Sequence, residues 1–201
     1  KIQEAFDKTD DDGHTEMPVI SFDYRYSNLC NFKCRMCGEQ LSSAWEAEKK
    51  KHDMWTVEHQ PFMQPTVKQK MQKFQKDVAE PEFKKAISDG LVEEIYWVGG
   101  EPLMYDMHWW ALEEMVNNGS AKNCYLRYNS NLSRVDFKGK NLFDYLPQFK
   151  DWLMCASIDG TGDIVEFIRK GIVWEEWLNN FKQGLAAPGG QHKMMFDLTI
   201  T

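Results

Sequence analysis

Three cysteines stand close together near the beginning of the chain. Cys30, Cys34 and Cys37 are separated by three residues and then by two. Three thiolates on one tight loop can wrap one face of an iron–sulfur cube, for which Cys thiolates are the usual protein ligands. A four-iron cluster normally has four such ligands, so three local ones leave one iron open to a chelating small molecule. The alternative is a zinc site completed by His52 or His59, but neither histidine lies at a typical zinc-finger spacing.

A second polar motif, Gly99-Gly100-Glu101, follows a predicted strand. Two glycines let the backbone approach a ligand closely, and a carboxylate can accept hydrogen bonds from an ammonium group. The alternative is a glycine-rich turn in which Glu101 favours the positive N-terminus of the next helix. Asn131 ends another predicted strand, where it either contacts a ligand or caps a turn.

A third motif combines Ser157 and Asp159-Gly160 with Arg169, twelve residues after the serine. A guanidinium group can grip a carboxylate with two hydrogen bonds, which suits the recognition of a charged ligand. The alternative is an ordinary Asp-Gly turn and a surface arginine paired with Glu166.

These motifs need elements that bring them together. Aromatic and β-branched residues predict strands over 19–27, 92–100, 123–131, 151–160 and 193–201. Helices are predicted from about 43, where Ser43 and Glu46 are spaced as a capping box, and over 66–78, 82–89, 107–118, 141–149 and 174–187. Strands that alternate with helices predict an α/β fold with a parallel sheet, in which chemistry gathers at the carboxyl ends of the strands.

Composition narrows the class of protein further. The net charge of −7 argues against a broad nucleic-acid interface, and the sequence contains no apolar run long enough to span a membrane. Residues 1–17 form an acidic, polar arm without a secretory signal, and residues 18–201 form the predicted core domain. The crowding of three of the five cysteines suits a metal site in a reducing cytoplasm, with Cys124 and Cys155 buried and reduced. The Lys-rich range 49–85 is expected to be a solvated insertion.

The pattern C-x-x-x-C-x-x-C after a first strand, with G-G-E after the second, resembles the signature of radical S-adenosylmethionine enzymes. The resemblance implies a partial, TIM-like (βα) barrel, the three-quarter barrel of that family, with about five of its usual six strands present. It also implies a 4Fe-4S cluster on Cys30, Cys34 and Cys37, with S-adenosylmethionine chelated to the open iron. In the family the reduced cluster cleaves this cofactor to a 5′-deoxyadenosyl radical, which abstracts hydrogen from a substrate.

The resemblance also assigns the residues that contact S-adenosylmethionine. Met36 stands where an aromatic residue is common and covers the adenine, the glycine–glutamate motif holds the amino group, and the serine and arginine approach the ribose or carboxylate. The implied cofactor-binding residues are Met36, Gly99, Gly100, Glu101, Asn131, Ser157 and Arg169. No residue is assigned as catalytic.

The Ser157 to Arg169 motif is similar to that of the twitch or SPASM group, whose members continue into a C-terminal domain with auxiliary clusters. Such a domain is absent from this chain or truncated, and the first residue, Lys1, suggests a piece of a longer protein. The group implies a peptide or protein substrate and an electron donor of the flavodoxin or ferredoxin type. The alternatives are a small-molecule task in nucleoside or cofactor biosynthesis and a non-catalytic iron–sulfur sensor.

Overall fold

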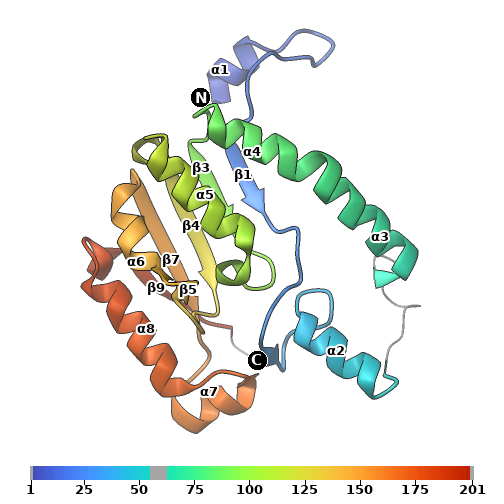
Figure 1. Ribbon diagram of the computed structural model, residues 1–201, viewed down its shortest axis with the longest axis vertical. Coiled ribbons are helices and arrows are strands. Elements are labelled where there is room, and N and C mark those ends of the chain that lie inside the picture. Colours follow the sequence, from blue (N-terminus) through green and yellow to red (C-terminus); the bar gives the residue numbers. More distant parts are fainter. Residues whose placement is uncertain (1, 55–62, 200–201) are drawn as a thin grey trace.

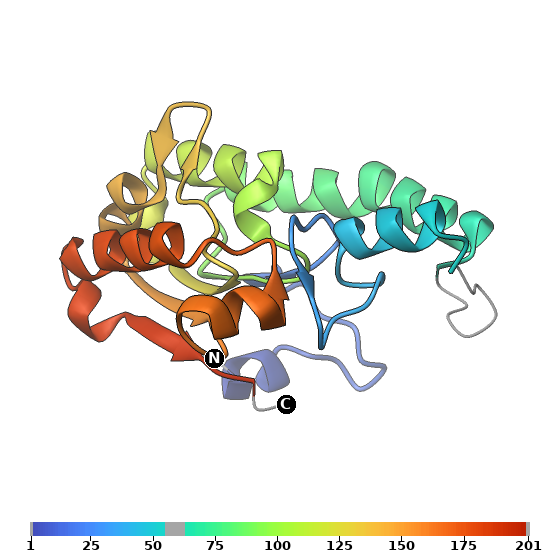
Figure 2. The same ribbon diagram turned by 90° about the horizontal axis from the view of Figure 1, so that it is seen from below.

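A parallel five-stranded sheet forms the centre of the protein. The computed structural model describes residues 2–54 and 63–199. The sheet has the order β1-β3-β4-β7-β9, and every neighbouring pair is parallel. Its strands are β1 (Ser21–Tyr24), β3 (Glu94–Trp97), β4 (Tyr125–Ser130), β7 (Asp151–Ser157) and β9 (Met194–Asp197). The predicted α/β class and the five strands are confirmed, each strand being shorter than its predicted range. The sheet is open and forms part of a barrel without closing (Figure 2).

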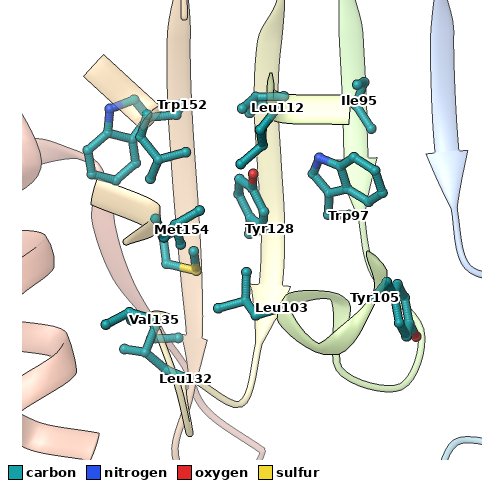
Figure 3. Packing of buried hydrophobic residues seen from close by; sticks show 14 of the residues in the cluster. Ile95, Trp97, Leu103, Tyr105, Leu112, Tyr128, Leu132, Val135, Trp152 and Met154 are labelled. Atoms are coloured by element: carbon teal, nitrogen blue, oxygen red, sulfur yellow. The ribbon is translucent and has the colours of Figure 1, made fainter. Parts of the chain in front are cut away.

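One face of the sheet carries the hydrophobic core. Side chains alternate along each strand, so that Ile95, Trp97, Tyr128, Trp152 and Met154 all point to the same side and are almost fully buried (Figure 3). The helices that cover this face are α4 (Glu80–Ser88), α5 (Asp106–Asn117), α6 (Leu142–Tyr145) and α8 (Trp174–Ala186) (Figure 1). The opposite face carries polar side chains that remain partly or fully exposed.

A long helix replaces the two short ones predicted over 66–78 and 82–89. Helix α3 (Pro65–Phe74) continues through a π-helical segment, η3 (Gln75–Ala79), into α4. Pro81 has no N–H to continue an α-helical ladder, and a widened π turn before it accommodates the missing hydrogen bond. The two predicted helices are therefore correct in position, but the break between them is wrong.

Several small elements were not predicted. Strand β2 (Lys33–Cys34) pairs antiparallel with β8 (Arg169–Lys170), and β5 (Asp136–Phe137) pairs with β6 (Lys140–Asn141). Helix α7 (Gly162–Ile168) lies beyond the carboxyl ends of the strands (Figure 1). Within the described residues, the unpredicted 3₁₀ turns include η4 (Pro102–Met104), η5 (Ala121–Asn123) and η7 (Gly190–His192), whereas η6 (Leu146–Gln148) completes the helix predicted over 141–149. Two-residue strands carry too little periodicity to be recognised from sequence.

The N-terminal arm contains helix α1 (Ile2–Asp7) and an antiparallel bridge between Thr9 and Thr15. Its described side chains up to Glu16 are exposed. Within the described residues, no helix is long and apolar enough to cross a membrane.

The Lys-rich range is more than a solvated insertion. Residues 55–62 of the range 49–85 lie outside the described part of the chain. Within the range, Phe83 is only 1% exposed, and Ile87, two residues after the end of the range, is fully buried in the core. Lys68 binds the buried carboxylate of Glu46 on helix α2 (Ser43–Lys51). The expectation of a purely solvated segment is therefore wrong for the described residues, because α4 buries one face against the sheet.

Candidate functional site

The cysteine loop leaves strand β1 and is held in place by helix α2. The Ser43 hydroxyl accepts a hydrogen bond from the Cys30 amide (3.1 Å) and lies 3.2 Å from the Cys30 carbonyl oxygen, to which it donates. Ser42, and not the predicted Ser43, caps the helix by accepting from the Trp45 amide (3.2 Å). The predicted capping box is thus wrong by one residue, because Ser43 is used to fix the cysteine loop.

The three thiols differ in their surroundings. Cys34 is 5% exposed, whereas Cys30 and Cys37 are half-buried. A hydrogen bond between Cys34 and Cys37, together with burial, raises the pKa of Cys34. The same hydrogen bond, with help from the positive charge of Arg169, lowers the pKa of Cys37 to about 6. Burial raises the pKa of Cys30 to about 11.

Three N–H groups point at these sulfurs. The Phe32 amide (3.5 Å) and Asn131 Nδ2 (3.6 Å) donate to Cys30 Sγ, and Arg169 Nη1 lies 3.9 Å from Cys34 Sγ. N–H donors and a cation stabilise sulfur in its anionic form. The donor chemistry of the loop, three thiols of which Cys30 and Cys34 have N–H partners, therefore fits an iron–sulfur cluster. Among the residues that the structure describes, no group of three or more His, Cys, Asp or Glu is arranged to hold a single metal ion.

The glycine loop after β3 packs directly on the segment that leads to the cysteines. A Cβ atom on Gly100 would stand 2.4 Å from the Leu29 carbonyl oxygen, and one on Gly99 would stand 3.2 Å from that of Ser27. The Gly100 and Glu101 amides donate to the Ser27 and Leu29 carbonyls at 3.1 and 2.7 Å. The Cβ positions of both glycines thus face the chain, so close backbone packing explains these residue types.

Glu101 is fully buried at the beginning of η4. Its Oε1 accepts hydrogen bonds from the Leu103 amide (3.0 Å) and the Ser130 hydroxyl (2.8 Å), and its Oε2 accepts from the Asn131 amide (2.7 Å). Burial raises the pKa of Glu101 to about 7, although these hydrogen bonds oppose the shift. The carboxylate therefore joins the loop after β3 to the loop after β4. If the amino group of a cofactor contacted Glu101, it would share carboxylate oxygens that already accept hydrogen bonds from these three donors.

The end of β4 contributes Asn131, which was singled out from the sequence. Its side chain donates to Cys30 Sγ and to Asn31 Oδ1 (3.1 Å), and its own Oδ1 accepts from the Ser133 amide (2.9 Å). Leu132, where a glycine would be more common, is fully buried with φ of +51°. A left-handed backbone is strained for leucine, and the complete burial of the Leu132 side chain offsets the cost of this strain.

The end of β7 brings Ser157 and Asp159 to the same edge of the sheet. Arg169 binds Asp159 with two parallel hydrogen bonds, Nε to Oδ2 (2.5 Å) and Nη2 to Oδ1 (3.0 Å). Both side chains are buried, at 9% and 1% exposure. The alternative of a surface arginine paired with Glu166 is wrong, because Glu166 accepts from the Trp174 amide instead.

A further network behind the cysteine loop was missed from the sequence. Asn28 donates to the Glu39 carbonyl and to Glu46 Oε2, both at 2.8 Å. Glu46 also accepts from Lys50 and Lys68. Burial raises the pKa of Glu46, but these hydrogen bonds outweigh it and the pKa falls to about 2. The only local signal is the excess of acidic and basic residues around 46–51, which does not identify their partners.

The two remaining cysteines lie on opposite sides of the sheet. Cys124 is fully buried, as predicted, whereas Cys155 is only half-buried on the face that points away from the helices. The prediction of burial is therefore wrong for Cys155, because its neighbours Met154 and Ala156 occupy the core-facing positions. All five thiols are free.

The sequence profile of the Radical SAM superfamily matches residues 24–186. This range includes the loop with the three cysteines, the loop with Glu101 and the segment with Arg169. This range covers most of the chain, and the chain belongs to the Radical SAM superfamily. Members of this superfamily use a 4Fe-4S cluster and S-adenosylmethionine, so the chain is an enzyme of the type that cleaves this cofactor. A search of curated proteins found no match.

Proposed function

We propose that Cys30, Cys34 and Cys37 hold the 4Fe-4S cluster and that S-adenosylmethionine binds beside it at the carboxyl ends of the strands. The observation that carries the proposal is one continuous set of contacts. Glu101 accepts from the Asn131 amide, and the Asn131 side chain donates to Cys30 Sγ. Loops after β1, β3 and β4 are thus joined within one layer, which is the layer where parallel α/β sheets carry their chemistry.

When bound, the cluster and S-adenosylmethionine supply the electron and the sulfonium that the superfamily uses for reductive cleavage and hydrogen abstraction. The chain's own residues orient these groups. Ser43 fixes the Cys30 backbone, and the contact of Gly100 with Leu29 sets the distance between the glycine loop and the cysteine loop. We assign Met36, Gly99, Gly100, Glu101, Asn131, Ser157 and Arg169 to the surroundings of the cofactor.

For the substrate we propose a peptide or protein, and for the subgroup the twitch or SPASM type. The motif from Ser157 to Arg169 supports the subgroup. The sheet face away from the helices supports a polar substrate, because Tyr96 donates to Asn129 (2.7 Å) and Arg127 pairs with Glu94 (3.3 Å) there. Such groups can exchange hydrogen bonds with a polypeptide backbone.

We further propose that residues 18–201 form the catalytic core and 1–17 a separate arm. Five free thiols support a reducing cytoplasmic location. The flavodoxin- or ferredoxin-type electron donor is proposed because the superfamily's cluster must be reduced before it acts.

The test is anaerobic reconstitution with iron and sulfide, followed by reduction in the presence of S-adenosylmethionine. The expected results are about four irons per chain and formation of 5′-deoxyadenosine and methionine. A colourless chain that binds one zinc would contradict the proposal. Transfer of deuterium from a labelled peptide into 5′-deoxyadenosine would test the substrate class, and transfer only from a labelled nucleoside would favour the small-molecule alternative.

A further inference from the structure

The position of Arg169 is set by a strand pair that lies at the cysteine loop. In the antiparallel pairing of β2 with β8, Cys34 stands opposite Arg169 and Lys33 stands opposite Lys170. The Arg35 amide donates to the Ile168 carbonyl (2.9 Å) and extends the same pairing. The strand pairing therefore holds the backbone of Arg169 directly opposite Cys34, the second cysteine of the loop.

The guanidinium group has a defined orientation within this pair. Asp159 occupies Nε and Nη2, and the Thr199 amide donates to Asp159 Oδ1 (3.0 Å). The remaining nitrogen, Nη1, lies 3.9 Å from Cys34 Sγ. Asp159 binds the Nε–Nη2 edge of the guanidinium, and Nη1 is the nitrogen that faces the sulfur. The charge nearest the Cys34 sulfur is therefore the positive charge of Arg169 and not the negative charge of Asp159. The Arg169 side chain is 9% exposed, so solvent screens this charge only weakly.

We infer that Arg169 sets the reduction potential of the cluster through the sulfur of Cys34. The inference rests on the proposed function, because it needs the cluster on this loop. Reduction adds one electron and hence negative charge to the cluster. A buried cation and an N–H donor beside a ligand sulfur favour that reduced state, so they raise the potential. Asn131 is the uncharged counterpart, since its Nδ2 donates to Cys30 Sγ.

This role accounts for a feature that cofactor contact alone leaves unexplained. A guanidinium can grip a cofactor carboxylate through its Nε–Nη edge or its Nη–Nη edge, and in Arg169 the Nε–Nη2 edge binds Asp159. Asp159 instead orients Nη1 toward the sulfur and keeps the charge in place. Arg169 is therefore a positioning and charge-supplying residue for the cluster.

The test is a potentiometric titration of the reconstituted cluster, followed by electron paramagnetic resonance, in wild type, Arg169→Gln and Arg169→Lys. The Arg169→Gln cluster should have a lower midpoint potential, with an equilibrium constant for reduction about tenfold smaller, which is about 59 mV for one electron. The Arg169→Lys value should fall between the two, because the charge remains without the fork. Lys170→Gln is the matched control: it removes the same charge one residue along, at an exposed position, and should leave the potential unchanged.

Iron content separates the two proposals. A wild-type chain that holds no cluster would contradict the proposed function, whereas equal potentials in iron-loaded wild type and Arg169→Gln would overturn this inference. Arg169→Gln leaves the carboxylate of Asp159 buried without its cation, which can itself cause loss of iron. In that case the double variant Arg169→Gln with Asp159→Asn is used, because it places two neutral amides there and leaves no unpaired buried charge. Its cluster should still have a lower midpoint potential than the wild-type cluster. An unchanged potential there, or loss of iron from both variants, would also overturn the inference, because Arg169 would then serve cluster retention.

Discussion

Replacement of Glu101 tests whether this carboxylate is a structural link between two loops. The structure gives it three donors, the Leu103 and Asn131 amides and the Ser130 hydroxyl, and no exposed surface. A carboxylate reserved for a cofactor would contribute little to the stability of the cofactor-free chain. We therefore expect Glu101→Ala to lower the free energy of unfolding even without cluster or cofactor.

The size of the effect follows from the donors that lose their partner. An unsatisfied buried donor costs about 1–3 kcal/mol. We take the low end of about 1 kcal/mol for each of the three donors, because the alanine variant also removes a buried charge. The expected loss is about 3 kcal/mol, which for a chain of this length is a fall in Tm of about 6–12 °C. Glu101→Gln keeps one accepting oxygen but turns an amide N–H₂ toward one donor, so about 1 kcal/mol should be lost.

The assay is thermal or urea unfolding of the cluster-free, reduced chain at pH 8, followed by circular dichroism. Glu82→Gln is the control, since Glu82 is an exposed acid on α4 and its change should stay within about 0.5 kcal/mol. Wild-type stability in both Glu101 variants would refute the reasoning. If they also bound S-adenosylmethionine weakly after reconstitution, the carboxylate would act as a cofactor ligand only.

Three further predictions concern the same site. Cys37→Ala should abolish cluster binding and Cys124→Ala should leave the iron content unchanged, as measured by iron analysis after reconstitution; iron loss in the Cys124 variant would contradict the ligand assignment. The low pKa of Glu46, about 2 in the folded chain, means that its stabilising contribution is present above the ordinary value of 4.5 and is lost as pH falls from 4.5 toward 2. Wild type should therefore lose its stability advantage over Glu46→Gln in that window, and a constant difference between the two unfolding curves would speak against the network. Gly100→Ala should destabilise the chain by about 1–3 kcal/mol because its Cβ would meet the Leu29 carbonyl, and an unaltered melting temperature would show that the two loops can separate freely.

The elements were predictable to the extent that their patterns are local. Runs of aromatic and β-branched residues identified all five strands, since these residue types pack well on the half-buried surface of a sheet. The same approach failed for β2, β5, β6 and β8, which have two residues each. It also placed a break at Pro81, because the π-helical segment that carries the helix past the proline has no sequence signature of its own.

The candidate site shows the same division. The spacing of Cys30, Cys34 and Cys37 indicates a cluster because the three ligands lie on one short loop. The role of Glu101 could not be obtained in this way, since its partners Ser130 and Asn131 are about thirty residues away. Periodicity likewise could not show that Asp159 and not Glu166 would bind Arg169.

The sequence by itself determined the α/β class, the order of the five strands along the chain and the cysteine loop, because each of these depends on residues that are neighbours in the chain. Only the tertiary structure decided what surrounds those residues. It turned Glu101 into the interior, packed Gly100 on Leu29 and set Arg169 beside Cys34. Burial and hydrogen-bond partners depend on which distant segments the sheet brings together, and these contacts decide how each charged side chain is used.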